Sequence, residues 1–573
     1  RWIADFLARA CLAGEPLNKV PSVCDPAVGG GQMLLAAFDA LRQNYPQASL
    51  LALVGALHGC DLDARAVTMA RRGLKLRVAQ VHGARHRSAE ACIDRQLVVG
   101  DGLFGPLERH DIVLTNPPYM GARSMPVALK ERLRAEWQPF HGDLYLAFLR
   151  RCQQIARRSV GVLAQQTVWY LASYTEARRL LLEHGQLEIF LHLGPHAFVN
   201  LNGEKASVVA YVQRVDRSAS KEQTAVFIDL REHKTPDKKR AALSRLLHND
   251  ASETQRPETR SIALSSFAQI PASPLAHWLP PALAGWFGRA ATTLGELAEI
   301  PGSQNKTGDN ARFVRRFESV DPAQITNAEG LWTSGDPEQA RWRFYSKGGS
   351  YAPWWGNWQH VVDWSPQARA FYASHRTANL LDERFWAREG LCYTDFCGDH
   401  FNARWMPAHC LFDMSGPAIF ARTTTDERRR LLALMALLNS TPARALLNAM
   451  NPSLHCQVRE LRLLPIPSWD DAIEARLAQS AQTLVETIRE MAHMVPGDPL
   501  YVAGLRAHER DGALAALQGY AVAERALDCM VCELYGCPEL VDSTQQREHA
   551  TVMAVRAVLS RAAGRDGEPG RSE

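Results

Sequence analysis

Long apolar runs are scarce in this sequence of 573 residues, and so is an excess of charge of either sign. The longest apolar run, at residues 431–438, falls well short of the roughly 20 residues that span a bilayer, so neither a transmembrane helix nor a membrane partner is expected. The 65 basic and 61 acidic residues leave a net charge of only +4. This balance excludes binding to nucleic acid through bulk charge but allows a local basic cleft.

Cysteine is also sparse, and the 12 cysteines are scattered mostly singly along the chain. In a chain of this size that distribution favours a reduced cytosol over a disulfide-stabilised secreted fold. Hydrophobic residues make up 46% and charged residues 22%, a balance that excludes a mainly disordered protein. Because the sequence begins at Arg1, with neither Met nor a signal peptide, we expect its natural start to lie upstream.

The first part of the chain alternates between helical and strand patterns. Helices are expected at residues 2–12, 32–41, 64–76, 144–156 and 175–184, and strands at 22–24, 57–60, 97–99, 112–115, 160–164, 187–191 and 207–212. Such alternation predicts βαβ units and an α/β fold with a mostly parallel sheet. Residues 234–260 are polar and are interpreted as a linker or surface excursion.

Three domains are expected from the changes in composition: residues 1–275, then an aromatic-rich mixed α+β region at 276–467, then a helical region at 468–573 with a disordered tail at 564–573.

Polar residues follow the first three predicted strands. Asp25, Pro26, Ala27, Val28 and three glycines form a turn that opens a helix, where glycine allows close approach to a ligand. Asp61 ends the second strand, where a carboxylate can accept hydrogen bonds from ribose hydroxyls. Asp101 ends the third and could accept from an exocyclic amine, with Leu103 beside the base. A structural βα turn is the competing interpretation for each site alone.

The strongest motif is Asn116-Pro117-Pro118-Tyr119, directly after the fourth strand. Two prolines stiffen the backbone and remove two N–H donors, so the Asn116 side-chain oxygen and the Pro117 carbonyl remain as acceptors. Two acceptors can hold both hydrogens of an –NH₂ group, and Tyr119 offers a flat face on which a base can stack. The alternative is a rigid β-turn with a packed tyrosine.

With these motifs in this order, the sequence resembles the N6-adenine DNA methyltransferases that use S-adenosyl-L-methionine. The resemblance implies a Rossmann-like methyltransferase core and base flipping. It implies Asn116, Pro117, Pro118 and Tyr119 as the catalytic motif, with Phe198 stacking the base opposite Tyr119. The cofactor-binding residues that it implies are Asp25, Pro26, Ala27, Gly29, Gly31, Asp61, Asp101, Leu103 and Phe148. Core packing remains the alternative for Phe148 and Phe198.

A closer resemblance extends into the second half. Residues 342–349, 354–357, 361–364, 401–405 and 451–453 are similar to segments of the methyltransferases of BREX- and DISARM-type phage defence and of type IIG restriction–modification proteins. This similarity implies a target-recognition domain at 276–467, double-stranded DNA as partner, other defence-system proteins as further partners, and a bacterial cytoplasmic location. A Thr-Pro pair that helps to hold the cofactor in these families would fall upstream of Arg1.

The recognition region contains polar and basic residues that suit contacts with phosphates and base edges. Lys306, Arg312, Arg315, Lys347 and Asn357 are the candidates, with a solvated loop as the alternative. The basic residues Lys238, Lys239 and Arg240 fit either a DNA contact or, more simply, a solvated surface.

No metal site is expected. Cys529, Cys532 and Cys537 have the first half of a zinc spacing but no second pair, which favours thiols packed on a helix. A metal-dependent nuclease cluster is also lacking, so DNA cleavage is not expected. Two other functions stay open: a methyltransferase acting on RNA or protein, and a DNA-sensing subunit of a defence complex with little methylation of its own.

Overall fold

The computed structural model describes residues 1–13, 19–83, 86–198, 207–216, 223–247, 258–336, 339–398, 400–422, 425–453, 455–501, 507–542 and 549–565. The chain divides into two compact units. Unit 1 contains residues 1–268 and 272–278, and unit 2 contains residues 269–271 and 279–573. Within the described residues, no helix combines the length and apolarity that crossing a bilayer requires.

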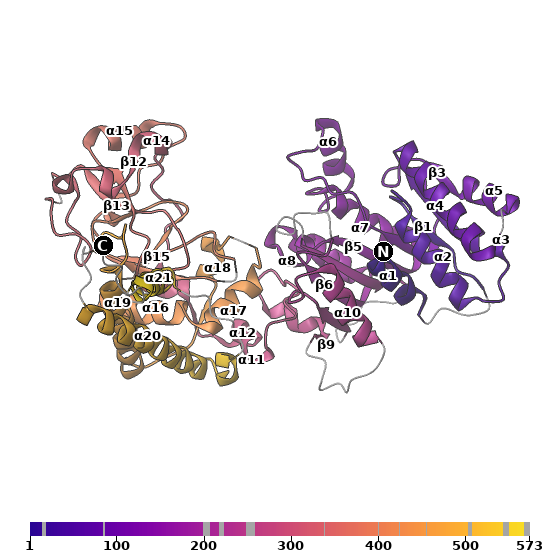
Figure 1. Ribbon diagram of the computed structural model, residues 1–573. Helices are drawn as coiled ribbons and strands as arrows, with labels where there is room; N and C mark the ends of the chain where they lie inside the picture. Colours follow the sequence, from indigo (N-terminus) through magenta and orange to yellow (C-terminus); the bar gives the residue numbers. More distant parts are fainter. Residues whose placement is uncertain are drawn as a thin grey trace, which may run out of the picture. The chain divides into compact units, whose positions relative to one another are not determined.

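Unit 1 is built on a nine-stranded sheet in the order β3-β2-β1-β4-β5-β7-β6-β8-β9 (Figure 1). The strands are β1 (Val23–Asp25), β2 (Leu57–Asp61), β3 (Leu97–Val99), β4 (His110–Thr115), β5 (Ala156–Gln165), β6 (Gln186–Gly194), β7 (Val208–Arg214), β8 (Thr224–Asp229) and β9 (Thr259–Ala263). The helices are α1 (Trp2–Leu12), α2 (Gln32–Asn44), α3 (Leu50–Gly55), α4 (Ala64–His82), α5 (Arg87–Gln96), α6 (Val127–Glu136), α7 (Leu144–Ile155), α8 (Thr167–Tyr170), α9 (Thr175–Glu183) and α10 (Pro236–Leu247).

Strand pairing confirms the predicted α/β class with a mostly parallel sheet. β1 is parallel to β2 and β4, β2 to β3, β4 to β5, and β6 to β8, whereas β7 runs antiparallel between β5 and β6 and β9 runs antiparallel at the edge. The chain leaves β1 toward β2 on one side and reaches β4 on the other. Parallel α/β sheets bind ligands at such a point, outside the carboxyl ends of the strands.

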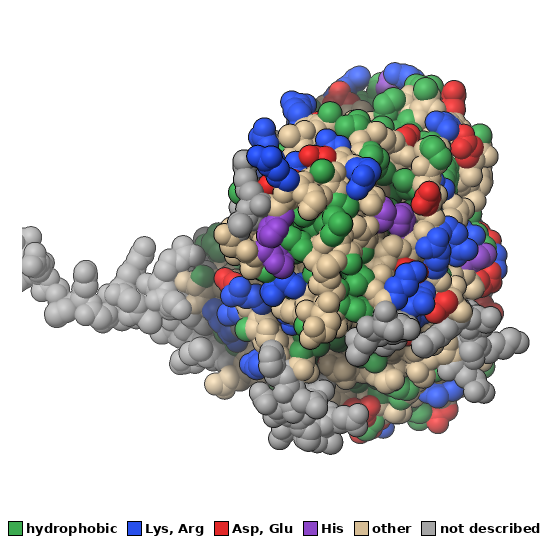
Figure 2. Space-filling model, turned by 90° about the vertical axis from the view of Figure 1, so that its right-hand side faces the viewer, with side chains coloured by type: hydrophobic (Ala, Val, Ile, Leu, Met, Phe, Trp, Pro, Cys, Tyr) green, Lys and Arg blue, Asp and Glu red, His purple; other side chains and the backbone are tan. Residues whose placement is uncertain are grey.

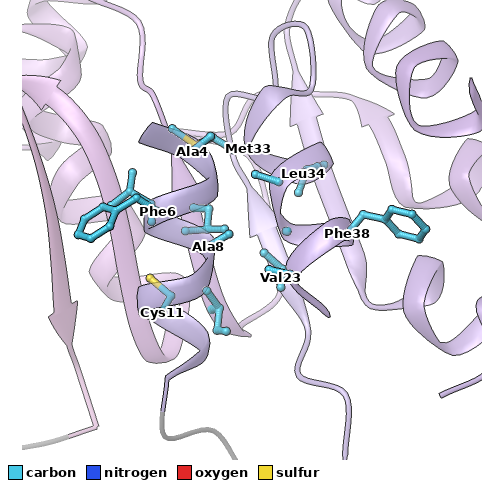
Figure 3. Close-up of a cluster of buried hydrophobic side chains, with 14 of the residues drawn as sticks. Ala4, Phe6, Ala8, Cys11, Val23, Met33, Leu34 and Phe38 are labelled. Carbon is cyan, nitrogen blue, oxygen red and sulfur yellow. The ribbon is translucent and has the colours of Figure 1, made fainter. Parts of the chain in front are cut away.

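The main core of unit 1 lies between the sheet and its helices. α1 and α2 contact each other, and Figure 3 shows Phe6 and Ala8 on opposite sides of α1, with Val23 and Leu34 on the side of Ala8. These four side chains are all nearly inaccessible to solvent. α1 also packs closely on β5, because a Cβ on Gly161 would lie 2.7 Å from the Cys11 sulfur.

The interpretation of residues 234–260 as a linker was wrong for the part that is described. Residues 236–247 form α10, and β8 and β9 extend the sheet beyond the strand that was expected to close it. Lys239, placed among solvated or DNA-contacting residues, is fully buried and donates hydrogen bonds to the carbonyl oxygens of Leu193 (2.6 Å) and Leu230 (2.7 Å). The sequence suggested a solvated side chain because the two carbonyl groups that accept hydrogen bonds from Lys239, at the ends of β6 and β8, lie outside the basic run.

Unit 2 contains two four-stranded sheets, β11-β18-β15-β16 and β12-β14-β13-β17, and the pair β10-β19. Its strands are β10 (Thr292–Thr293), β11 (Ala298–Glu299), β12 (Val314–Arg316), β13 (Trp342–Ser346), β14 (His360–Asp363), β15 (Gly390–Tyr393), β16 (Ala403–Met406), β17 (Leu411–Phe412), β18 (Ala418–Ala421) and β19 (Pro465–Ile466). Its helices are α11 (Pro281–Ala284), α12 (Trp286–Arg289), α13 (Leu294–Leu297), α14 (Asn310–Phe313), α15 (Pro366–Ser374), α16 (Glu427–Leu438), α17 (Thr441–Met450), α18 (Val458–Arg462), α19 (Asp471–Ala492), α20 (Ala507–Leu534) and α21 (Ala550–Arg565).

The predicted helical C-terminal region is present. α19 begins where the Asp470 carboxylate accepts a hydrogen bond from the Ile473 N–H (2.8 Å), and its buried face, which includes Leu477 and Leu484, contacts α16 and α20. α21 extends to residue 565. Of the tail expected to be disordered, residues 566–573 lie outside the described residues.

Candidate active site

The four strand ends that carry the sequence motifs lie along one edge of the unit 1 sheet. Asp25 pairs with Gly59 and Asp61 with Val99, while Val23 pairs with Ile112. Because these strands are all parallel, their carboxyl ends point the same way. The glycine turn after β1, Asp61 after β2, Asp101 after β3 and Asn116 after β4 therefore share that edge, as the sequence predicted.

Glycine is required in the turn after β1. Gly29 and Gly31 have φ values of 49° and 81°, in the left-handed region that favours glycine. A Cβ on Gly31 would also lie 3.0 Å from the Cα of Ala70 in α4, so α2 and α4 can approach closely only at a glycine. Gly30, between them, is exposed, and a Cβ there would meet open space. The turn thus presents bare backbone outward, which suits close approach of a ligand.

Asp61 ties the second strand to this turn. Its Oδ2 accepts a hydrogen bond from the Gly29 N–H (2.9 Å), and its Oδ1 accepts one from the Asp63 N–H (3.0 Å). The Val28 N–H donates to the Cys60 carbonyl (3.0 Å) beside it. Asp61 is only half-buried, and a carboxylate can accept about four hydrogen bonds, so it retains capacity for a ligand hydroxyl.

Asp25, in contrast, faces inward. It is 2% exposed, and its Oδ1 accepts hydrogen bonds from the Ala27 N–H (3.1 Å) and the Thr115 hydroxyl (2.9 Å). Burial raises the pKa of the Asp25 carboxyl to about 7, against the effect of these two hydrogen bonds. Asp25 thereby joins the ends of β1 and β4, and it holds the glycine turn beside the Asn116 segment.

Asp101 shapes the turn after β3. Its Oδ1 accepts hydrogen bonds from the N–H groups of Leu103 and Phe104, both at 2.9 Å. The intervening Gly102 is packed so tightly against the first turn that a Cβ would lie 1.8 Å from the Pro26 carbonyl oxygen. The two cofactor-site candidates from separate strands, the turns after β1 and β3, are thus in direct contact.

Leu103 and Phe148 lie in a small apolar cluster separate from the main core. They are 3% and 7% exposed, and they pack with Ala147, Met125, Leu133 and Trp137. Ala27 of the glycine turn lies against the same cluster, which α6 and α7 supply from the other side. Phe148 is therefore a packed core residue. The apolar cluster to which it belongs also borders the candidate cofactor site.

The Asn-Pro-Pro-Tyr segment leaves β4 with Pro117 buried and with Asn116 and Pro118 exposed. The Tyr119 hydroxyl donates to the Asn116 Oδ1 (2.7 Å) and lies 3.3 Å from the Leu163 carbonyl oxygen on β5. Burial of this hydroxyl raises the pKa of Tyr119, so it stays protonated and acts as a donor. The Tyr119 side chain is nevertheless 40% exposed. In this state the predicted acceptor oxygen of Asn116 is therefore occupied by the neighbouring hydroxyl.

A clamp from the start of α7 fixes this segment, and sequence reasoning missed it. The Asp143 Oδ1 accepts hydrogen bonds from the N–H groups of Met120 (3.0 Å) and Tyr145 (3.3 Å), while the Leu144 N–H donates to the Met120 carbonyl (3.0 Å). Burial raises the pKa of the Asp143 carboxyl despite these bonds. The available signal was an aspartate directly before a helix, a common N-cap, but nothing local indicated its second partner at Met120.

Phe198 follows β6, and the register places the end of β6 on the edge that carries Asn116. Thr115 pairs with Val162 on β5, Gln165 of β5 pairs with Val208 on β7, and Val208 also pairs with Gly194. Phe198 itself is half-buried against the main core, and the chain is described only to this residue before residue 207. Its role as a stacking residue stays a prediction.

The five candidate DNA contacts all lie in unit 2 and differ in availability. Lys306, Arg312 and Arg315 are exposed. Lys347 forms an ion pair with Asp413, and Asn357 uses its Nδ2 to donate to the Ser350 carbonyl (2.8 Å), so both are engaged within the fold. Figure 2 shows the side of the molecule on which unit 1 faces the viewer, not the unit 2 candidates. On that face Lys and Arg side chains are interspersed with Asp and Glu and form no continuous basic stripe, which agrees with the small net charge.

Among the residues that the structure describes, no group of three or more His, Cys, Asp or Glu side chains is placed to hold a metal ion. Cys532 and Cys537 are buried, and the Cys537 thiol lies 3.5 Å from the Cys532 carbonyl oxygen.

This chain is similar to known proteins in both sequence and structure. Residues 4–256 match the family model described as N-6 DNA Methylase. The adenine-specific methyltransferase PglX of Lacticaseibacillus casei (strain Zhang) is 25% identical over 394 residues, covering 67% of this chain and 31% of PglX. The adenine-specific methyltransferase BrxX of Escherichia coli O9:H4 (strain HS) is 26% identical over 362 residues, covering 63% of this chain and 28% of BrxX. The chain thus spans about a third of the length of these relatives.

Among solved structures, the type IIL restriction-modification enzyme MmeI in complex with DNA aligns with a TM-score of 0.55 and 12% identity. The alignment covers 98% of this chain and 76% of MmeI, which supports a shared fold. The resemblance to N6-adenine methyltransferases that the sequence motifs indicated is confirmed by these matches.

Proposed function

We propose that this chain, with its N-6 DNA methylase segment and its likeness to adenine-specific methyltransferases, is a site-specific DNA methyltransferase. It transfers a methyl group from S-adenosyl-L-methionine to the N6 amine of an adenine in double-stranded DNA, in bacterial phage defence or restriction–modification. The observation that carries this proposal is the proximity of two features at one sheet edge. An exposed Asn-Pro-Pro-Tyr segment and a bare glycine turn are joined by the buried Asp25–Thr115 hydrogen bond (2.9 Å).

The residues at the edge fit the proposed cofactor. A Cβ at Gly30 meets open space, so a ligand can approach the backbone there, and the half-buried Asp61 carboxylate can accept ribose hydroxyls. Asp101 can accept a hydrogen bond from the polar edge of an adenine ring, and the buried Leu103–Phe148 cluster lies beneath the turns that would hold the ring. When bound, the cofactor supplies a methyl group on a positively charged sulfur, which becomes neutral as the methyl leaves.

The chain itself contributes alignment and lone-pair release. The Asn116 Oδ1 and the Pro117 carbonyl accept the two hydrogens of the target amine, which draws the nitrogen toward a tetrahedral geometry and directs its lone pair at the methyl group. Tyr119 and Phe198 hold the extruded base between their rings. The attacking atom is an exocyclic nitrogen, so no cysteine nucleophile is needed.

The Tyr119 hydroxyl and the target amine would both bind the Asn116 Oδ1. The 2.7 Å hydrogen bond between Tyr119 and Asn116 uses one of the two lone pairs of this oxygen, so the amine either takes the other lone pair or displaces the hydroxyl. Rotation of the tyrosine away from Asn116 would release the acceptor and free the ring to stack on the base. The remaining contact of the hydroxyl, 3.3 Å from the Leu163 carbonyl, offers it an alternative partner nearby.

The proposed target-recognition domain is the region of residues 276–467, which apart from residues 276–278 of unit 1 lies in unit 2, with residues 468–573 as a helical support. MmeI, which shares the fold, was solved in complex with DNA. Lys306, Arg312 and Arg315 are the exposed candidates for phosphate or base contacts. The ion-paired Lys347 and the hydrogen-bonded Asn357 would have to exchange their present partners.

The test is Asn116→Ala, assayed by transfer of tritium from labelled cofactor to duplex DNA. We expect transfer to be abolished and cofactor affinity, measured by calorimetry, to be unchanged. Asn44→Ala, an exposed asparagine at the end of α2, is the matched control and should behave as the wild type. Near-normal transfer by Asn116→Ala would remove the proposed role of this residue. RNA and protein acceptors in parallel reactions separate DNA methylation from the two other methyltransferase activities.

A further inference from the structure

A second polar site lies in unit 2, in a cavity of about 730 Å³. The cavity is lined by residues from α14, β13, β14 and α15 and from the chain before β13. Four of its lining residues are arginines and one is a carboxylate: Arg312, Arg341, Arg343, Arg369 and Asp363. Cavities of this size hold small organic ligands, and the excess of positive charge selects for an anion.

Aromatic rings hold three of these guanidinium groups in place. Arg312 lies 4.6 Å from the ring centre of Phe313, Arg343 lies 5.6 Å from that of Trp364, and Arg369 lies 5.2 Å from that of Trp386. Stacking on an aromatic face leaves the edge of a guanidinium, where its N–H donors are, open to hydrogen bonds in the plane of the group. Arg343 already uses its Nη1 to donate to the Trp386 carbonyl (2.8 Å), so Arg312 and Arg369 are the binding candidates. Because the side chains are already oriented, an anion would lose little entropy in ordering them.

The single carboxylate does not balance the arginines. Asp363 forms an ion pair with Arg341 (2.6 Å), and its Oδ1 accepts a hydrogen bond from the Ser365 N–H (3.0 Å). Burial and, to a smaller extent, the neighbouring charge of Arg369 together lower the pKa of Arg343 to about 10. Like charges held close together in this way are costly unless an anion lies between them.

Two buried hydrogen-bond donors belong to residues that line this cavity. Within the described part of the chain, the Arg369 Nε and the indole Nε1 of Trp364 have no hydrogen-bond partner, and Trp364 is 4% exposed. Both donors lack an acceptor in the protein and can therefore bind a ligand atom placed within their reach. The first residues of α15, from Ser365 to Ala368, also line the cavity, which places the positive end of that helix there.

We propose that this cavity binds a phosphate-bearing anion through Arg312 and Arg369, with Arg343 adding positive charge to the cavity. The phosphate comes either from the backbone of DNA or from a free phosphorylated ligand. In both cases a fork of guanidinium N–H groups meets the phosphate oxygens, which suits Arg better than Lys. The site lies outside the methyl-transfer machinery of unit 1. If the phosphate comes from DNA, the inference rests on the DNA binding proposed above for unit 2, in which Arg312 is already a candidate contact.

The experiment measures binding of inorganic triphosphate to the full chain by calorimetry at low ionic strength. Arg369→Gln should bind triphosphate about tenfold more weakly, since a hydrogen bond to a charged group contributes roughly that much. Arg376→Gln is the matched control, because Arg376 is exposed just beyond α15 and does not line the cavity. Circular dichroism melting of both variants ensures that any difference reflects binding by folded protein.

Addition of a duplex oligonucleotide then identifies the source of the phosphate. Displacement of triphosphate by the duplex, with the same dependence on Arg369, assigns the site to the DNA backbone. Simultaneous binding of both assigns it to a free phosphorylated ligand. The proposal is overturned if triphosphate fails to bind the wild type, or if Arg369→Gln and Arg376→Gln bind it equally. Methyl transfer measured on the same variants shows whether unit 1 is active regardless of that result.

Discussion

The hydrogen bond from Tyr119 to Asn116 allows a sharp test of the reaction geometry. Tyr119→Phe removes one hydroxyl, which donates to the Asn116 Oδ1 at 2.7 Å and lies 3.3 Å from the Leu163 carbonyl, and keeps the ring. The shorter contact is a neutral hydrogen bond, worth about 1 kcal/mol net. We propose that the target amine takes the lone pair that this bond uses, in which case loss of the hydroxyl should raise kcat/KM, by at most about fivefold.

Tyr119→Ala removes the ring as well and should act in the opposite direction. Stacking of a base on an aromatic side chain contributes about 1–3 kcal/mol, so we expect kcat/KM to fall by roughly 10- to 100-fold. Both variants should bind cofactor normally. Among the described residues, the Tyr119 hydroxyl contacts Asn116 and Leu163 and its ring packs on Tyr145, and none of these belongs to the glycine turn.

Single-turnover tritium transfer gives the rates, and a fluorescent base analogue at the target position reports extrusion. The reasoning is refuted if Tyr119→Phe loses more than about tenfold in kcat/KM while extrusion is unchanged. In that case the hydroxyl would act in the transition state, and the bond to Asn116 would be part of the active arrangement rather than a contact to be broken.

Two further predictions concern how the site is held. The buried Asp25 has a pKa of about 7 when folded, against 3.8 as its ordinary value, so the folded chain binds more protons between these values and loses stability as pH rises through about 7. Asp25→Asn should therefore gain stability relative to the wild type as the pH rises from 5 to 8, by roughly 3 kcal/mol, measured as a growing difference in unfolding temperature; a pH-independent difference would contradict the assigned pKa. Gly102→Ala should cost about 1–3 kcal/mol and weaken cofactor binding, because its Cβ would lie 1.8 Å from the Pro26 carbonyl. Gly30→Ala, with open space around its Cβ, should leave thermal unfolding unchanged, and equal melting of the two variants would disprove the close approach of the turns.

Much of unit 1 followed from local pattern. The predicted helix at 2–12 and the predicted strand at 97–99 have the bounds of α1 and β3, and the other predicted elements of residues 1–212 differ by a few residues at their ends, with the helix at 64–76 extending to His82. Their periodicity is a property of neighbouring residues, so it can be read without knowing the fold. Helices α3, α5 and α6 were not predicted, and they are short or strongly polar.

The predictions that were wrong or missing concern side chains whose contacts lie elsewhere in the sequence. Lys239 belongs to a basic run, yet it is buried because the carbonyl groups of Leu193 and Leu230 satisfy its ammonium group. Asp143 looks like an ordinary N-cap, and only the folded chain brings the Met120 N–H to it. The arginines of the unit 2 cavity come from segments as far apart as residues 312 and 369, with no shared motif.

The sequence alone determined most of the strands and the longer helices up to residue 212, the identity of the glycine turn and of the Asn-Pro-Pro-Tyr segment, and the family that these resemble. These features are encoded in residues adjacent along the chain, where spacing and side-chain type are sufficient. Only the tertiary structure decided that Tyr119 occupies the oxygen of Asn116, that Asp25 is buried and joins β1 to β4, and that four arginines line one cavity. Each of these depends on distances between atoms that the chain brings together only by folding, since burial and pairing are properties of the packed molecule.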